Sequence, residues 1–276
     1  MDSRQDGAGG AAGPGSVLND AFALAEPELS VVIPAYNEQA RIADTLLRVK
    51  DFLHHWGKPS ELILVDDGSR DLTLEVVKTI DIYGALMKEQ VTTRIATDVS
   101  NHGKGEAVRR GFALARGRFV LFSDADLSTP IEEVEKLLAA LAGGADIAIG
   151  SRRLPTSEVE PQPIHRRLMG GIFSTLVRLL AVPGVRDSQC GFKCYRRAVA
   201  HRIAELQKLP GFSFDVEHLY LARRLGWKVV EVGVRWVDAP GTKVKPVRDS
   251  YRMFRDLLRI RRLHRGLARP PAEARR

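Results

Sequence analysis

The sequence predicts an α/β fold with a mostly parallel central sheet, and two observations carry the prediction. Short apolar runs recur through the first 151 residues, and stretches with a helical pattern separate them. Such runs are typical of strands that are buried on both faces of a parallel sheet. Strands that alternate with helices indicate right-handed crossovers, with helices covering both faces of the sheet.

The expected elements follow one another along the chain. Strands are expected at 29–36, 61–68, 118–124 and 146–151, with helices at 38–56, 71–88, 103–116 and 131–142. The rhythm changes after about residue 152. Helices are then expected at 164–182 and 214–225, a short strand after the polar turn 187–193, and strand-like alternation at 227–236. We expect this α+β half to complete the same globule.

Composition divides the chain into three parts. Residues 1–26 are rich in Gly and Ala without a sustained period, which predicts a flexible leader before a folded domain at 27–246. Residues 247–276 are expected to form a basic amphipathic helix and tail. From Arg248 to Arg276, ten arginines face three acidic residues, so this segment carries +7 of the formal net charge of +8. The nearly neutral body argues against a nucleic-acid-binding protein.

The arginines of the tail gather on one side of the predicted helix. At about 100° per residue, five of them fall in an arc of roughly 80°; they are Arg248, Arg252, Arg255, Arg259 and Arg262. Such a helix can lie on an anionic membrane surface. It can also pack its apolar side on the domain, and both can hold at once. Only Tyr251 and Phe254 could stack on bases, so nucleic acid is not an expected partner.

The cellular compartment is predicted from three features that the sequence lacks: a disulfide framework, a membrane span and a secretion signal. Cys190 and Cys194 are the only cysteines, without a second pair or a flanking His, so neither a disulfide framework nor a zinc site is expected. No run reaches the roughly 18 apolar residues that a membrane span needs. Residues 1–26 do not have the pattern of a secretion signal. We expect a cytoplasmic protein that is peripheral at the cytosolic face of a membrane.

Polar residues follow three predicted strands at their carboxyl ends, where open parallel sheets bind ligands. They are Tyr36, Asn37 and Glu38, then Asp66, Asp67, Gly68 and Ser69, and finally Asp124 and Asp126. Helix capping accounts for Ser69 or Asp71 but poorly for acids at three strand ends. Clustered carboxylates repel one another unless a cation or hydrogen-bond donors are present. Asp124 and Asp126 are therefore candidate ligands of Mg²⁺ or Mn²⁺, which carboxylates hold together with substrate phosphates.

A glycine-rich turn adds a candidate diphosphate site. No G-x-G-x-x-G follows the first strand and no G-x-x-x-x-G-K-[ST] occurs, which argues against a dinucleotide fold and a P-loop. Asn101–Gly105 instead offers backbone amides and the Lys104 ammonium at a helix start, and these groups suit a diphosphate. An ordinary glycine turn with a solvated lysine has the same pattern.

Taken together and in order, these motifs resemble those of family 2 glycosyltransferases. The matching motifs are Val32–Glu38, Leu64–Ser69, Asn101–Gly105 and Asp124–Asp126. Ile149–Arg152 and Asp187–Lys193 resemble the branch that glycosylates polyprenyl phosphates. The resemblance covers about residues 29–245. It implies the GT-A fold, a Rossmann-like nucleotide-diphospho-sugar transferase architecture, and an inverting transfer from a nucleotide sugar.

The resemblance also implies a role for each matched position. On the donor side, Pro34, Tyr36 and Glu38 would contact the nucleoside, Asp66 or Asp67 the base or ribose, and Lys104 the donor, while Asp124 and Asp126 would hold the metal on the diphosphate. On the acceptor side, Arg152 and Arg166 would hold a phosphate, and Asp187 and Gln189 would lie beside the transferred sugar. Asp126, Asp187 and Arg152 are the expected catalytic residues.

Departures from the family pattern narrow the substrate. Processive members carry Q-x-x-R-W, but Val232 stands at the glutamine position before Arg235-Trp236, so polymer synthesis is disfavoured. Mannosyltransferase relatives often read D-A-D-L-Q, whereas Ser128 occupies the last position here. This difference favours UDP-glucose as donor and a polyprenyl (dolichyl or undecaprenyl) phosphate as acceptor; GDP-mannose remains the alternative.

The acceptor chemistry and the membrane contact complete the expectation. A phosphate monoester has a second pKa of about 6 and is largely dianionic at neutral pH, so no dedicated base is required. Many relatives add transmembrane helices after the catalytic domain. We expect membrane contact here to be peripheral or supplied by a membrane-protein partner, and removal of residues 248–276 to lower recruitment while the donor site survives.

Overall fold

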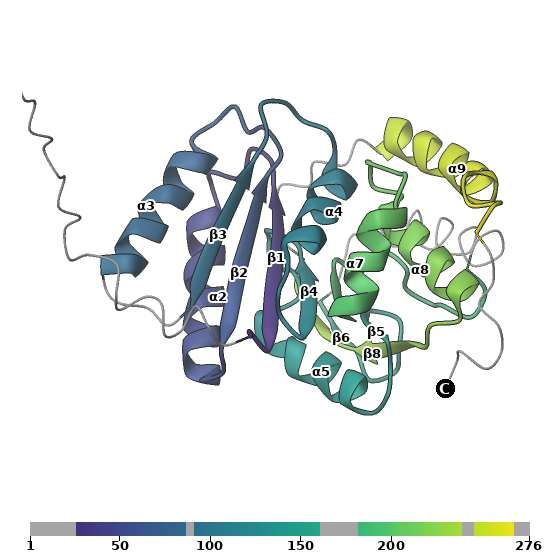
Figure 1. Cartoon of the computed structure of the whole chain (residues 1–276), viewed down its shortest axis with the longest axis horizontal. Helices are drawn as coiled ribbons and strands as arrows, with labels where there is room; N and C mark the ends of the chain where they lie inside the picture. Colours follow the sequence, from purple (N-terminus) through teal and green to yellow (C-terminus); the bar gives the residue numbers. More distant parts are fainter. Residues whose placement is uncertain (1–25, 87–90, 161–181, 239–245, 268–276) are drawn as a thin grey trace, which may run out of the picture.

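A seven-stranded sheet with helices on both faces forms the centre of the molecule (Figure 1). The structure is a computed structural model that describes residues 26–86, 91–160, 182–238 and 246–267. In spatial order the strands are β3 (Thr92–Thr97), β2 (Ser60–Asp66), β1 (Leu29–Ala35), β4 (Phe119–Ser123), β7 (Phe192–Arg196), β5 (Ile147–Ser151) and β8 (Val229–Gly233). β7 runs antiparallel to β4 and β5, and the other pairs are parallel. The predicted mostly parallel sheet is confirmed.

Two groups of helices cover the two faces of this sheet (Figure 1). One face carries α4 (Lys104–Leu114), α7 (Arg197–Leu206), α8 (Phe214–Leu225) and α9 (Pro246–Leu263). The other carries α2 (Ile42–Trp56), α3 (Thr73–Leu86) and α5 (Val134–Ala142), the last preceded by a 3₁₀ turn, η1 (Ile131–Glu133). Beside the main sheet, β6 (Glu158–Val159) pairs in parallel with β9 (Arg235–Trp236).

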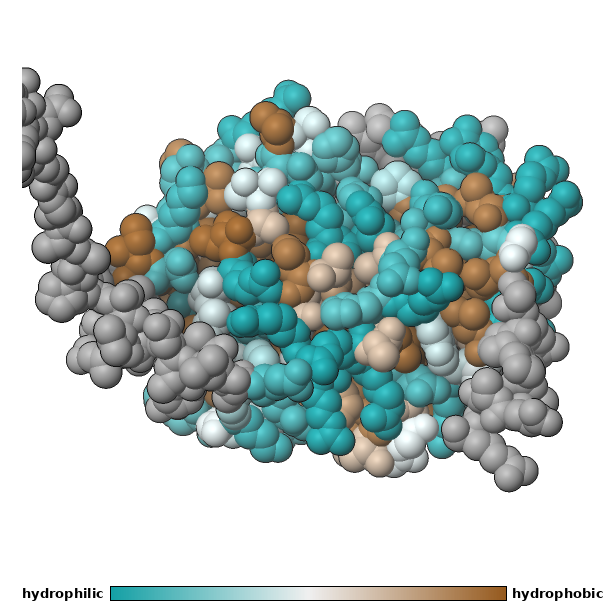
Figure 2. Space-filling model, viewed as in Figure 1, coloured by the Kyte–Doolittle hydropathy of each residue, from teal (hydrophilic) through white to brown (hydrophobic). Residues whose placement is uncertain are grey.

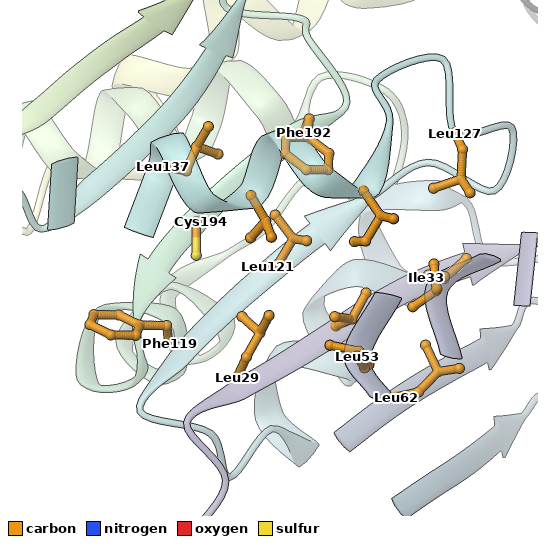
Figure 3. Packing of buried hydrophobic residues seen from close by; sticks show 14 of the residues in the cluster. Leu29, Ile33, Leu53, Leu62, Phe119, Leu121, Leu127, Leu137, Phe192 and Cys194 are labelled. Atoms are coloured by element: carbon orange, nitrogen blue, oxygen red, sulfur yellow. The ribbon is translucent and has the colours of Figure 1, made fainter. Parts of the chain in front are cut away.

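The apolar strand residues divide between the two faces with a period of two. Val32 of β1 belongs to the core beneath α4, while Val31 and Ile33 belong to the core beneath α2 and α5. Figure 3 shows this second core, with side chains such as Ile33, Leu121 and Leu137 converging from the strands and the covering helices. Burial of each such side chain contributes about 1.5–3 kcal/mol, so both faces of the central strands stabilise the fold.

Three features differ from the sequence-based expectation or extend it. β3 was not among the strands expected, because its sequence TTRIAT is largely polar and it lies at the sheet edge, where alternation is weak. The alternating run 227–236 divides at Val234 into β8 and β9. α7 begins directly after β7, in a region for which no helix was predicted. The expected helix at 164–182 lies almost entirely outside the described residues, as does the leader apart from Glu26, so both stay predictions.

Helix α9 packs its apolar side on the domain. Met253, Leu257 and Ile260 are buried, and the last two belong to the core shared with α4, α7 and α8. Arg252, Arg255, Arg259 and Arg262 are exposed. Of the two alternatives for this helix, packing therefore holds for its apolar side, and removal of residues 248–276 would uncover part of the core. No helix in the described parts of the chain combines the length and apolar character that crossing a membrane requires.

Candidate active site

The carboxyl ends of β1, β2 and β4 meet at one edge of the sheet. Ala35, the last residue of β1, pairs with Asp66, the last residue of β2. Val32 pairs with Phe122 of β4, so Asp124 emerges at the same edge. The parallel register thus brings together side chains that are up to 90 residues apart in the sequence.

Asp67 holds the glycine-rich turn in place. Its carboxylate accepts hydrogen bonds from the Asn101 side chain and from the backbone N–H groups of His102 and Gly103, each at 2.8 Å. Burial raises the pKa of Asp67 above its ordinary value of 3.8, although these bonds oppose the shift. All of its donors come from the turn, so the structure gives Asp67 a positioning role.

Asp66 has a different environment from its neighbour. One oxygen, Oδ2, accepts the Ser69 N–H at 3.1 Å. The other, Oδ1, is buried and has no hydrogen-bond partner within the described ranges. A buried acceptor without a partner is costly unless a ligand supplies the donor. Of the two aspartates, Asp66 therefore has the oxygen that can accept a hydrogen bond from a ligand.

Reciprocal bonds join the loop after β1 to the loop after β2. The Asn37 N–H donates to Ser69 Oγ at 2.9 Å, and the Arg70 N–H donates to Asn37 Oδ1 at 2.8 Å. Asn37 has a φ of 53°, a left-handed conformation that Asn tolerates better than most residues. Asp71 accepts the Thr73 N–H at the start of α3, so capping explains Asp71, whereas Ser69 connects the loops.

Lys104 and Asp124 form an ion pair at the centre of the site. The Lys104 ammonium at the start of α4 lies 2.5 Å from Asp124 Oδ1, and about a quarter of its side chain is exposed. Burial alone would lower the pKa of Lys104, but the charges of Asp124 and Asp215 outweigh it and raise the pKa above 10.5. Lys104 therefore stays charged, as binding of a diphosphate requires.

A strained turn presents Asp126 beside this pair. Asp126 Oδ1 accepts the Ser128 N–H at 3.0 Å, and Leu127 between them has a φ of 45°. A left-handed leucine is uncommon and costs of order 1 kcal/mol or more. Strain of this kind clusters at functional sites, and here it accompanies a carboxylate that is partly exposed.

The two carboxylates fit a divalent cation that is shared with a diphosphate. Across the described segments, no group of three or more His, Cys, Asp or Glu side chains could hold a metal ion. Asp124 and Asp126 supply two carboxylates one residue apart. Mg²⁺ is commonly bound through one or two carboxylates, with phosphates and waters completing its octahedron. The donor set thus suits a cation that arrives with a phosphorylated substrate.

Gly191 is a functional residue that the sequence reasoning did not single out. Its carbonyl accepts the Asp124 N–H at 3.0 Å, and a Cβ there would overlap the Asp124 carboxylate. Position 191 requires glycine because of this close approach and not because of an unusual backbone angle. The signal was a glycine immediately before a predicted strand, within the motif Asp187–Lys193.

Arg152 and Asp187 form a second ion pair, in which Asp187 is buried and the Arg152 side chain is 27% exposed. Arg152 Nε and an Nη donate to the two oxygens of Asp187 at 2.7 and 2.9 Å, and the Arg152 N–H adds a bond of 3.0 Å. Burial alone would raise the pKa of Asp187, but Arg152 lowers it to about 2. The Asp187 charge in turn keeps the pKa of Arg152 above its ordinary value.

Further groups orient this pair. Glu231 accepts the N–H groups of Arg186 and Asp187 at 2.8 and 2.9 Å. The Trp236 ring centroid lies 5.6 Å from Arg152 Cζ, within cation–π range. Neither Glu231 nor Trp236 was assigned a role from the sequence, because nothing local indicates that β8 and β9 reach the site.

The expected site residues fall into two groups joined by the segment 187–191. The donor group is Pro34, Tyr36, Glu38, Asp66, Asp67, Lys104, Asp124 and Asp126. The second group is Arg152, Asp187 and Gln189, whose N–H lies 3.3 Å from Asp187 Oδ1. Gly191 links the groups through its contact with Asp124. Arg166 lies outside the described residues and stays a prediction.

The fold and the acidic site at its sheet edge define a glycosyltransferase of the GT-A type. Residues 30–204 match the sequence model of Glycosyl transferase family 2, and the chain belongs to that family. The resemblance noted from the motifs is confirmed. The solved glucosyl-3-phosphoglycerate synthase of Mycobacterium tuberculosis, in complex with Mn²⁺, UDP-glucose and glycerol 3-phosphate, superimposes with a TM-score of 0.62. It is 22% identical, covers 95% of this chain and 88% of its own, and confirms the fold.

Two relatives that are each at least 36% identical share one name. The dolichyl-phosphate beta-glucosyltransferase of Drosophila melanogaster is 39% identical and covers 84% of this chain and 74% of its own. The dolichyl-phosphate beta-glucosyltransferase of Homo sapiens is 36% identical and covers 85% and 75%, respectively.

Proposed function

We propose that the protein is an inverting glucosyltransferase that transfers glucose from UDP-glucose to a polyprenyl phosphate, such as dolichyl or undecaprenyl phosphate. One observation carries the proposal: Lys104, Asp124 and Asp126 converge at the sheet edge in a chain that is 39% identical to a dolichyl-phosphate glucosyltransferase. The products are the polyprenyl phosphate glucose and UDP.

The donor is held at the edge formed by β1, β2 and β4. Asp66 Oδ1 accepts a hydrogen bond from the nucleoside, and Pro34, Tyr36 and Glu38 line the same edge. Lys104, at the start of α4, faces the diphosphate, since helix N-termini favour anions. The N–H groups of His102 and Gly103, which the sequence had offered to the diphosphate as well, donate to Asp67 instead. Asp67 contributes by holding this turn rather than by contact with the donor.

Asp124 and Asp126 hold Mg²⁺ or Mn²⁺ in this proposal. When bound, the cation neutralises charge on the departing diphosphate, as a Lewis acid does. Lys104 adds a second positive charge at the same place. Electrostatic stabilisation of a leaving group is commonly the largest contribution to such a transfer.

The acceptor phosphate supplies the nucleophile. One of its oxygens attacks the anomeric carbon of glucose from the face opposite UDP. As the new C–O bond forms, the bond from that carbon to the diphosphate oxygen breaks, and its electron pair leaves with UDP. Arg152, aligned by Asp187, and Arg166 orient the phosphate, which needs no general base because it is already dianionic.

The outer face of α9 supports a peripheral position on an anionic membrane at the cytosolic face. Its exposed arginines surround Phe254 and Leu258, which are 38% and 58% exposed. In Figure 2 the end of the molecule with α9 shows mainly hydrophilic residues with hydrophobic ones among them. Each arginine near an anionic surface contributes about 1 kcal/mol to binding.

Transfer of label to lipid tests this function. The full chain is incubated with Mg²⁺ or Mn²⁺ and a short polyprenyl phosphate, with labelled UDP-glucose and labelled GDP-mannose in separate reactions. We expect lipid-bound label from UDP-glucose only, and none when the lipid is a polyprenol without phosphate. Label from GDP-mannose alone would replace the proposed donor, and no lipid product from either would overturn the acceptor.

Replacement of one carboxylate tests the metal assignment. Asp126→Ala is expected to lower kcat by at least about 100-fold, since it removes a ligand of the cation at the leaving group. Asp51→Asn, on the exposed surface of α2, is the matched control and should keep normal turnover. Near-normal turnover of Asp126→Ala at saturating metal would contradict the assignment.

A further inference from the structure

The turn that carries Lys104 rests on a segment from a distant part of the chain. A Cβ on Gly103 would lie 2.5 Å from the Pro210 carbonyl oxygen, and one on Gly105 would lie 2.7 Å from that of Leu209. The Glu106 N–H donates to the Pro210 carbonyl at 3.1 Å. Residues 207–211, which we call the support segment, therefore fix the position of the turn that carries Lys104 at the sheet edge.

A side chain of the support segment strengthens this contact. Gln207 Nε2 donates to the carbonyl oxygens of Gly105 and Leu209, at 2.8 and 3.0 Å. Gln207 Oε1 lies 2.8 Å from His218 Nε2, and His218 Nδ1 lies 3.2 Å from the Tyr195 hydroxyl. Both polar atoms of the Gln207 side chain thus have hydrogen-bond partners that are themselves buried.

Glu217 of α8 holds the support segment from the other side. Its side chain is fully buried, and its two oxygens accept the N–H groups of Lys208 and Leu209 at 2.9 Å each. His264, just after α9, places Nε2 2.6 Å from Glu217 Oε1 and is itself 4% exposed. A fully buried carboxylate is costly without such partners, so His264 fixes Glu217 and Glu217 fixes residues 208 and 209.

We propose that Glu217 and His264 are positioning residues for the donor site. They hold the support segment, the support segment holds the Gly103–Gly105 turn, and the turn aims the Lys104 ammonium at the diphosphate. The residue that follows the C-terminal helix thereby supports a site from which it is itself absent. The inference rests on the proposed function only in taking Lys104 as a ligand of the donor diphosphate.

Hydrogen exchange tests the positioning without any substrate. In His264→Ala, we expect the amides of Lys208, Leu209 and Glu106 to exchange about 10-fold faster than in the unmodified chain, while the amides of β1 keep their rates. His264→Gln should restore slow exchange, because its side-chain amide can donate to Glu217. Leu257→Ala, a buried apolar change on the adjoining helix α9, is the control for loss of packing alone. Unchanged exchange at residues 106, 208 and 209 in His264→Ala would overturn the inference.

A double-mutant cycle tests whether the two residues act through Lys104. The dissociation constant of UDP with Mn²⁺ is measured for His264→Ala, for Lys104→Ala and for both together. His264→Ala is expected to weaken UDP about 10-fold when Lys104 is present and by much less when it is absent. If His264→Ala weakened UDP binding by the same factor with and without Lys104, the proposed action through Lys104 would be contradicted. Failure of glucose transfer by the unmodified chain would overturn the proposed function, yet leave the exchange result to decide the positioning role.

Discussion

Asp66 and Asp67 are chemically identical, adjacent and equally buried, yet the fold gives them different tasks. Asp67 is saturated by three donors from the Asn101–Gly103 turn, while Asp66 keeps one acceptor for a ligand. The sequence motif contains both and cannot separate them. The two aspartates are distinguished only by the positions of the N–H groups around each carboxylate.

Replacement of each aspartate should therefore have a distinct effect. Asp67→Asn places an amide N–H against backbone donors, and we expect it to lower the free energy of unfolding by about 1–3 kcal/mol and to weaken UDP indirectly. Asp66→Asn should weaken UDP with a smaller change in stability. Urea unfolding and UDP titration of both variants measure the difference. If Asp66→Asn lowered the free energy of unfolding more than Asp67→Asn, the roles assigned to the two aspartates would have to be exchanged.

The Asp187 carboxylate makes stability depend on pH. Its pKa falls from 3.8 to about 2 on folding, so its charge stabilises the folded state above pH 4 and this contribution is lost as the pH falls from 4 towards 2. The shift corresponds to about 2 kcal/mol.

The difference in unfolding free energy between the unmodified chain and Asp187→Asn should therefore shrink by about 2 kcal/mol between pH 5 and pH 2. Urea unfolding at a series of pH values measures it. Gln189→Ala, which removes a neighbouring side chain that does not titrate, should give a difference that stays constant. A constant difference for Asp187→Asn as well would rule out the charge pair with Arg152 as the source.

At the scale of the elements, β7, which runs antiparallel to both of its neighbours, connects the two halves of the site. β7 lies between β4 and β5, so the segment before it passes from Asp187, beside Arg152, to Gly191, beside Asp124. Asp124 and Arg152 stand at the ends of strands that do not pair with each other. The β7 insertion sets the distance between the Lys104–Asp124 pair and the Arg152–Asp187 pair.

Gly191→Ala is expected to displace the Asp124 carboxylate, because the added Cβ would overlap it. We expect kcat to fall by at least about 100-fold, comparable with loss of a metal ligand, while the fold is retained. Gly211→Ala is the matched control, since a Cβ there meets nothing within 4 Å. Transfer assays and thermal unfolding of both variants separate site damage from instability. Normal turnover of Gly191→Ala would show that Asp124 has room to move.

The sequence predicted the elements whose patterns are set by burial. β1, β2, β4 and β5 are buried throughout and mostly apolar, and all four lie at the places expected within a few residues. β3 was not predicted because an edge strand buries few apolar side chains. Its backbone pairing with β2 holds it in the sheet instead. The placement of Asp124 at the sheet edge followed from strand order, and its pairing with Lys104 is seen in the structure alone. Glu217, Glu231 and His264 depend on contacts between distant segments that no local pattern records.

Over the whole molecule, the charge is separated from the site. The helices α2 and α3 lie at one end and α9 lies at the other (Figure 1). The C-terminal segment carries +7 of the total charge, and its arginines on α9 point away from the core that Leu257 and Ile260 enter. A molecule of this kind is oriented by an anionic surface, because only one end of it is attracted.

Binding to anionic vesicles should follow the arginines of α9. Replacement of Arg255, Arg259 and Arg262 by Gln is expected to weaken partitioning about 100-fold, from about 1 kcal/mol for each charge. The same replacement of Arg48, Lys58 and Lys78, which are exposed on or near α2 and α3, removes an equal charge and should have little effect. Vesicle sedimentation at two salt concentrations measures both. Equal losses would mean that net charge alone governs binding.

The pair of Lys104 with Asp124 has a consequence for the order in which the site fills. The lysine acts as an internal counterion, so a cation that arrives alone must compete with it for the carboxylate. A diphosphate offers the ammonium other oxygens and thereby releases Asp124 for the cation. With the proposed metal site, metal and donor would be thermodynamically linked, each raising the affinity for the other by the same factor. The enzyme is expected to take up its metal as a complex with the nucleotide sugar and to release it together with UDP when transfer is complete.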